Sequence, residues 1–194
     1  MEAFMPAREL STHAMEELDT LSGASVDSAA DYYPVYDASA GKVVRVLAGG
    51  GAFGDPLVDC TASTLTVTRA LHARKIVTLN RAAGVAVTMP DATGTGEKYT
   101  FIIGTTVTSN STTIKAPDAS NVMAGLAVMS ADGGSTSNAW ETAADTDTIT
   151  FNGSTTGGIK GDIVELIDIA ADTWHVKVIG ASTGAEATPF SATV

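Results

Sequence analysis

The stretch GVAVTMPDATGTGEKYTFII, residues 84–103, predicts the fold class of this chain. Within it, residues 84–89 and 98–103 are two short runs in which large apolar side chains recur at every second position. A period of two sends successive side chains to opposite faces of a strand. The Pro, Asp and Gly residues between the two runs favour turns. The stretch therefore predicts two short strands, each with one inward face, joined by a turn-rich connection.

The same signal continues along the chain, in residues 64–68, 75–79, 112–115, 147–151, 162–167 and 173–179. Turn residues such as Asn152-Gly153 and Gly157-Gly158 separate these runs. Many short strands without alternating helices indicate a mainly β fold, an antiparallel β-sandwich or barrel, and the sequence leaves both closures open. Residues 121–145 are rich in Ala, Ser, Asp and Gly without a clear period, which predicts a long loop.

The N-terminal part has a different pattern. Its apolar residues recur at spacings of four, four and three, which predicts one stripe of a short amphipathic helix; they are Leu10, Ala14, Leu18 and Leu21. A small polar linker follows, then an extended segment, a turn and a strand over residues 33–47, which predict a hairpin. We therefore predict an N-terminal arm with a short helix at 1–31, a hairpin and Gly-rich linker at 32–58, and a β domain at 59–194.

Charge and cysteine content exclude several classes of protein. The 194 residues carry 22 acidic and 11 basic side chains, a net charge of -11, which repels the phosphates that nucleic-acid-binding proteins neutralise. The single cysteine, Cys60, excludes an intrachain disulfide and leaves too few thiolates for a zinc site. The sequence shows neither a secretory signal nor an apolar run of about 18 residues, so we expect a soluble protein made in a cytoplasm, without direct contact to nucleic acid or membrane.

Three acidic residues near one strand signal are candidate catalytic groups, because a glycosidase needs two carboxylates at a set separation; they are Asp162, Glu165 and Asp168. An odd separation places Asp162 and Glu165 on opposite faces of a strand, which favours a solvated face and a turn. Residues 153–160 superficially match a phosphate-binding loop, but its lysine is followed by glycine and no helix is predicted after it. We interpret that segment as a hairpin turn.

The remaining reactive side chains also lack a recognisable arrangement. The spacing of His13, His72 and His175 matches no metal-binding motif, and roles in strand packing or at the surface are favoured. Cys60 has no activating neighbours in the sequence, so a small buried thiol is favoured. We therefore predict a protein that is not an enzyme, with no catalytic residues, no cofactor and no metal.

Several segments that together span most of the chain resemble small structural proteins of tailed phages. They consist of turn and strand residues, so the resemblance is structural and not catalytic. The segments are YPVYDASAGK (33–42), RAAGVAVTMPDATGTG (81–96), YTFIIGTTVTSN (99–110), TITFNG (148–153), GGIKGD (157–162) and TPFS (188–191).

The resemblance implies a bacteriophage virion protein, and a short chain with one β domain and an arm looks more like a capsid decoration (cement) protein than a long-shafted fibre. It implies binding to the major capsid protein on the outer capsid surface, which stabilises the shell, and a homo-oligomer with a trimer favoured. We expect the arm to lie along neighbouring capsid subunits, so the residues of its apolar stripe, Leu10, Ala14, Leu18 and Leu21, are candidate partner-binding residues.

The alternative is a receptor- or glycan-binding module of a head fibre or tail. It would use residues 121–145 and an exposed Trp140, because aromatic rings stack on sugars. Simple packing, or an oligomer interface, is the competing interpretation of Trp140.

Overall fold

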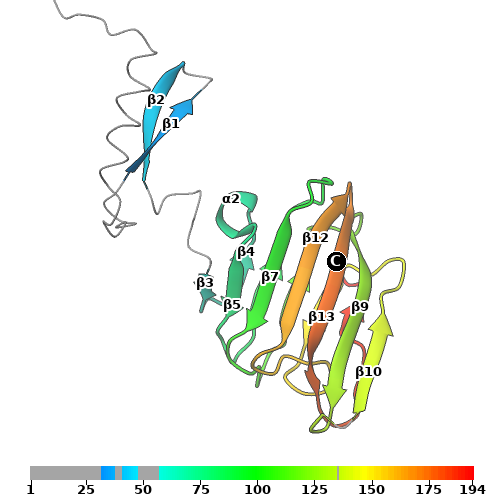
Figure 1. Ribbon diagram of the computed structural model, residues 1–194. Helices are drawn as coiled ribbons and strands as arrows, with labels where there is room; N and C mark the ends of the chain where they lie inside the picture. Colours follow the sequence, from blue (N-terminus) through cyan, green and yellow to red (C-terminus); the bar gives the residue numbers. More distant parts are fainter. Residues whose placement is uncertain (1–31, 38–40, 48–56, 135) are drawn as a thin grey trace, which may run out of the picture. The chain divides into compact units, whose positions relative to one another are not determined.

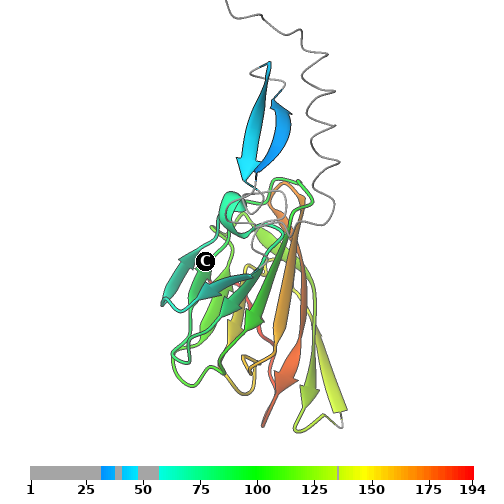
Figure 2. The ribbon, with the colours of Figure 1, turned by 60° about the vertical axis from the view of Figure 1, so that its left-hand side comes forward.

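The described residues from Leu57 onward form two mixed β-sheets (Figure 1, Figure 2). The computed structural model describes residues 32–37, 41–47, 57–134 and 136–194. By its internal contacts the chain divides into two units, Met1–Gly54 and Asp55–Val194. None of the helices in the described residues is both long enough and apolar enough to span a membrane.

Each sheet of the second unit is an open row of strands. In order across it, the seven-stranded sheet consists of β10 (Thr136–Glu141), β9 (Val122–Ala131), β13 (Thr173–Ser182), β12 (Ile163–Ala170), β7 (Lys98–Ile103), β5 (Ile76–Leu79) and β3 (Leu57–Cys60). The five-stranded sheet consists of β14 (Phe190–Ser191), β11 (Thr148–Phe151), β8 (Thr112–Lys115), β6 (Ala86–Thr88) and β4 (Thr64–Thr66). A short helix, α2 (Arg69–His72), lies between β4 and β5 in the chain.

The first six strands of this unit wind between the two sheets. Successive strands alternate from one sheet to the other, so that β3, β5 and β7 are parallel neighbours in the first sheet. In the same way β4, β6 and β8 are parallel neighbours in the second. Parallel strands need a crossover connection. Here a strand of the facing sheet provides that crossover in place of a helix, which is why a chain without alternating helices still forms parallel pairs.

The later strands close this arrangement mainly with antiparallel pairs. β12 pairs antiparallel with both β7 and β13, and β11 pairs antiparallel with both β8 and β14. The long pair β9–β13 is again parallel. The predicted mainly β fold is confirmed, and of its two closures the sandwich fits the two packed sheets. The sheets are mixed, however, and not antiparallel throughout as predicted.

Alternating side chains of both sheets form one core. Tyr99, Phe101 and Ile103 of β7 are buried, as are Ile114 of β8 and Phe151 of β11 from the opposite sheet. Burying a side chain of this size contributes about 1.5–3 kcal/mol to stability. This double layer of short strands explains the period of two that the sequence shows in both halves of the chain.

Aromatic side chains anchor the centre of the core. The Trp174 side chain of β13 is fully buried, and its ring meets that of Tyr99 edge to face, with centroids 5.5 Å apart and an interplanar angle of 78°. Such a pair adds about 0.5–1.5 kcal/mol to the area that it buries.

Residues 121–145 are not the predicted loop. They form β9 and β10, which pair antiparallel through residues such as Val128 and Ala139. The buried, inward positions of β9 are Met123, Ala127, Met129 and Ala131. The period of two is present there, but small residues on both faces hide it. The Trp140 side chain, expected to be exposed, is half-buried and packs against the core, because it lies opposite buried Ala127.

The first unit contains the predicted hairpin. β1 (Tyr32–Asp37) and β2 (Lys42–Leu47) pair antiparallel, from Tyr32 opposite Leu47 to Asp37 opposite Lys42. Gly41 adopts a positive φ of 63° just before β2, a conformation that suits a glycine turn. The predicted arm, with Leu10, Ala14, Leu18 and Leu21, lies outside the described residues. The internal contacts divide the chain between Gly54 and Asp55. The boundaries predicted from the sequence, after residues 31 and 58, stay predictions.

Candidate functional site

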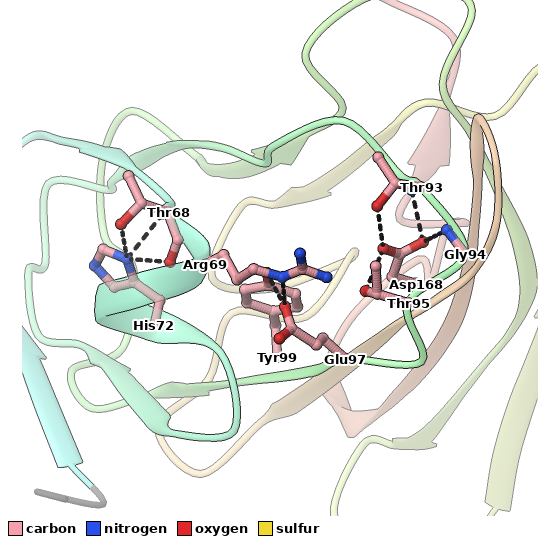
Figure 3. Close-up of polar contacts among 9 residues, drawn as sticks. All are labelled: Thr68, Arg69, His72, Thr93, Gly94, Thr95, Glu97, Tyr99 and Asp168. Carbon is pink, nitrogen blue, oxygen red and sulfur yellow. Dashed lines mark hydrogen bonds and ion pairs between the residues drawn. The ribbon is translucent and has the colours of Figure 1, made fainter. Parts of the chain in front are cut away.

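A hollow of about 250 Å³ lies where α2, the connection between β6 and β7, and the end of β12 meet (Figure 3). The winding of the chain brings these segments together. The helix α2 lies on the connection from β4 of the five-stranded sheet to β5 of the seven-stranded sheet, and the β6–β7 connection is the next one that runs from the same sheet to the other. The residues that line the hollow are polar apart from one proline and the ring of one tyrosine: Arg69, Pro90, Asp91, Thr93, Glu97, Tyr99 and Asp168.

Asp168 attaches the β6–β7 connection to β12. The residue is only 3% exposed, and its carboxylate accepts hydrogen bonds from the backbone N–H groups of Thr93 and Gly94. It also accepts hydrogen bonds from the hydroxyls of Thr93, at 3.2 Å, and Thr95, at 2.7 Å (Figure 3). Burial acts to raise the pKa of Asp168, but these hydrogen bonds outweigh it and hold the pKa below its ordinary value of 3.8. The prediction of a solvated carboxylate was wrong for this residue.

Glu97 joins the other side of the hollow. It forms an ion pair with Arg69 of α2 and accepts a 3.4 Å hydrogen bond from the hydroxyl of Tyr99. Burial, together with the negative charge of Glu97, raises the pKa of Tyr99 to about 12. The phenol therefore keeps its proton at neutral pH. The carboxylates of Glu97 and Asp168 are both engaged in contacts with neighbouring segments, and these contacts stabilise the fold around the hollow.

Asp162 has a similar structural role at another connection. The residue is 3% exposed, and its carboxylate accepts hydrogen bonds from the backbone N–H groups of Gly158 at 2.7 Å, Ile159 at 3.0 Å and Ala181 at 2.9 Å. Burial raises its pKa, and the three hydrogen bonds offset only part of that effect. The turn expected at Asp162 is present, but the solvated environment was wrong, because the carboxylate points to backbone donors.

Residues 153–160 contain a tight turn, closed by an antiparallel bridge between Ser154 and Gly157, but they do not form the predicted hairpin between the flanking strands. They connect β11 of the five-stranded sheet to β12 of the seven-stranded sheet, so the flanking strands are not partners. Gly157 and Gly158 adopt positive φ angles of 81° and 92°. A Cβ at Gly158 would lie 2.8 Å from the Cβ of Phe151, so glycine is required there by space as well as by conformation.

The other predicted residues do not converge. Glu165 lies on the outer face of the seven-stranded sheet, where it forms ion pairs with Lys98 and Lys177. His175 is exposed on the same face, whereas His72 is buried and accepts a 2.9 Å hydrogen bond from the backbone N–H of Thr68. The described ranges contain no group of three or more His, Cys, Asp or Glu side chains placed to hold a metal ion.

Cys60 is buried, as favoured from the sequence. His13 lies outside the described residues.

The outer face of the seven-stranded sheet carries a continuous apolar row. The strand register places its members side by side on five neighbouring strands; they are Ala139, Val128, Ile179, Ile163 and Ile102, and we call them the apolar row. Val128 and Ile179 are 37% and 52% exposed. Figure 1 views this sheet face on, with the five-stranded sheet behind it.

A second row beside it mixes apolar and charged residues. It contains Leu126 on β9, the ion-paired Lys177 and Glu165 at the centre, and the exposed Ile76 and Leu57 near the opposite edge. Alternation along β13 could have suggested which residues face outward. It could not show that the outward residues of five strands meet, because strand order and register are tertiary properties.

Comparisons of the chain with family models, with curated proteins and with solved structures find no match.

Proposed function

We propose that this chain is a non-enzymatic structural protein of a tailed-phage virion, a capsid decoration protein that binds the outer capsid surface and stabilises the shell. The observation that carries the structural part of this proposal is the apolar row. The virion part rests on the resemblance of segments such as 81–96 and 99–110 to small phage structural proteins.

An apolar row of this kind serves association better than catalysis. Soluble monomers rarely expose contiguous apolar patches larger than a few hundred Å², and larger ones mark interaction sites. Removing apolar surface from water contributes about 25 cal/mol per Å², so covering several half-exposed aliphatic side chains favours binding by several kcal/mol before its entropic costs. By contrast, the acidic groups of the hollow are held in hydrogen bonds within the chain.

The charge of the chain fits a protein that is made in many copies and then assembled. A net charge of -11 keeps separate copies soluble and acts against binding to packaged nucleic acid. The same charge favours a basic surface on a capsid partner.

Antibody labelling of intact particles tests the proposal. We expect labelled antibody against this chain to decorate heads, and labelling confined to tails would instead favour the receptor- or glycan-binding alternative. That alternative has lost part of its support, because the half-buried Trp140 packs against the core and is not the exposed aromatic ring that it requires.

Deleting residues 1–31 tests the anchoring role of the arm. We expect the truncated chain to keep its β circular-dichroism signature and thermal transition yet lose occupancy on particles, because the β domain carries its own core. Unchanged occupancy would contradict anchoring, and a lost thermal transition would assign the apolar stripe to the protein's own core.

A further inference from the structure

We propose that the outer face of the seven-stranded sheet binds the same face of a second copy of this chain. The inference rests on the proposed function, since both assign this face to protein association. It gives the apolar row to contact between two copies and leaves contact with the capsid to the arm. It also expects a dimer in place of the trimer that the resemblance favours. The pairing is face to face, with the apolar row of one copy crossing that of the other.

The size of the face suits a stable pair. Two rows of outward side chains cross all seven strands, and further rows cross the longer central strands. Strands lie about 4.8 Å apart and outward side chains about 6.7 Å apart along a strand, so the face covers on the order of 700 Å². A standard protein–protein interface buries about 800 Å² per partner. One copy of this face thus nearly matches the area that a specific pair needs.

The charge of the face favours a second copy as the occupant. The charged side chains of the two rows and of the neighbouring Lys98 position are Lys98, Lys177, Glu165, Glu141 and Asp59, two basic and three acidic. The whole chain carries 22 acidic against 11 basic side chains, so most of its excess negative charge lies elsewhere. Two identical acidic chains repel each other least where such a balanced face meets its copy.

The central charges also tolerate burial. Glu165 is ion-paired to both Lys98 and Lys177 within one chain. Docking a second copy would therefore cover charges that already have partners, and it avoids the several kcal/mol that an unpaired buried charge costs. Two sheets that pack face to face lie about 10 Å apart with their strands turned by about 30°, a geometry that a twofold axis through the apolar row permits.

The test uses the full chain and measures its mass in solution. We expect the wild-type protein to be a dimer by light scattering after size separation. Ile179→Glu places a charge in the middle of the apolar row and should weaken the dimer at least tenfold. The matched control is Leu71→Glu, because Leu71 is 61% exposed in α2, away from this face, and its substitution should leave the mass unchanged.

The outcomes separate cleanly. A monomeric wild-type protein at about 100 µM, far above the dissociation constant of a stable pair, would overturn the proposal, as would a trimeric mass, which face-to-face pairing does not give. A dimer that persists in folded Ile179→Glu would overturn it too, and so would equal disruption by Leu71→Glu. If Ile179→Glu fails to keep the wild-type thermal transition, Val128→Lys, at another exposed position of the row, replaces it.

Particle occupancy is measured separately, so that the failure of one proposal is distinguished from that of the other. A monomeric Ile179→Glu that still occupies heads supports self-association through this face and leaves decoration in place. A wild-type dimer that never labels heads overturns decoration, while the mass measurements still support the pairing.

Discussion

Replacing Asp162 by Asn should destabilise the protein by about 2 kcal/mol, because its three hydrogen-bond partners are backbone N–H groups. One carboxylate oxygen accepts from Gly158 and Ile159, and the other accepts from Ala181. An asparagine amide offers a single oxygen, so in either orientation at least one backbone donor faces an NH₂ group. The connection between the two sheets then loses part of its attachment to β13.

The magnitude follows from two opposing effects. A buried donor left without an acceptor costs about 1–3 kcal/mol, and the bonds that remain lose the strength that the carboxylate charge gave them. Against this, burial raises the pKa of Asp162, so a neutral side chain recovers part of the free energy of desolvation. The net loss in the free energy of unfolding is therefore about 2 kcal/mol and not about 4 kcal/mol.

Asp168→Asn is the matched control. The partners of one Asp168 oxygen are the hydroxyls of Thr93 and Thr95, and a hydroxyl can rotate to accept from an amide. The other oxygen keeps its two backbone donors, so we expect a loss of about 1 kcal/mol. Urea unfolding of both variants at pH 7, followed by tryptophan fluorescence, measures the difference. A loss in Asp168→Asn equal to or larger than that in Asp162→Asn would refute the argument from donor chemistry.

Three further outcomes are expected. Hydrogen bonds hold the pKa of Asp168 below 3.8 in the folded protein, so its stabilising contribution is complete above about pH 5 and is lost as the pH falls through the pKa of the folded state. The difference in unfolding free energy between wild type and Asp168→Asn should therefore narrow by about pH 3. A difference that widens would contradict this. Gly125→Ala should lower the free energy of unfolding in urea by more than about 3 kcal/mol, since the new Cβ would lie 1.8 Å from the Val176 carbonyl oxygen. Gly133→Ala, with open space around it, should lower it by about 1 kcal/mol. Equal losses of stability would argue against the close approach at Gly125. Buried Cys60 should react with a thiol reagent only after denaturation, and rapid labelling of the native protein would show that it is accessible.

Local pattern was enough to locate many of the strands. The predicted runs 98–103 and 112–115 coincide with β7 and β8, and the hairpin over 33–47 matches β1 and β2. Alternation of side chains and turn residues such as Gly157 are properties of a few neighbouring residues, so they are visible without any knowledge of the fold. Where both faces of a strand carry small residues, as in β9, that signal is weak and the strand was missed.

By itself, then, the sequence determined the mainly β class, the positions of most strands and the acidic charge that acts against nucleic-acid binding. Only the tertiary structure decided that the strands β3 to β8 alternate between the two sheets and form parallel pairs within each sheet, since strand order depends on contacts between distant segments. It likewise decided that Asp162 and Asp168 are buried among donors from other segments, and that Val128 and Ile179 meet on one face. Alternation tells which residues share a side of a strand, but which strands lie beside it is determined by packing over the whole chain.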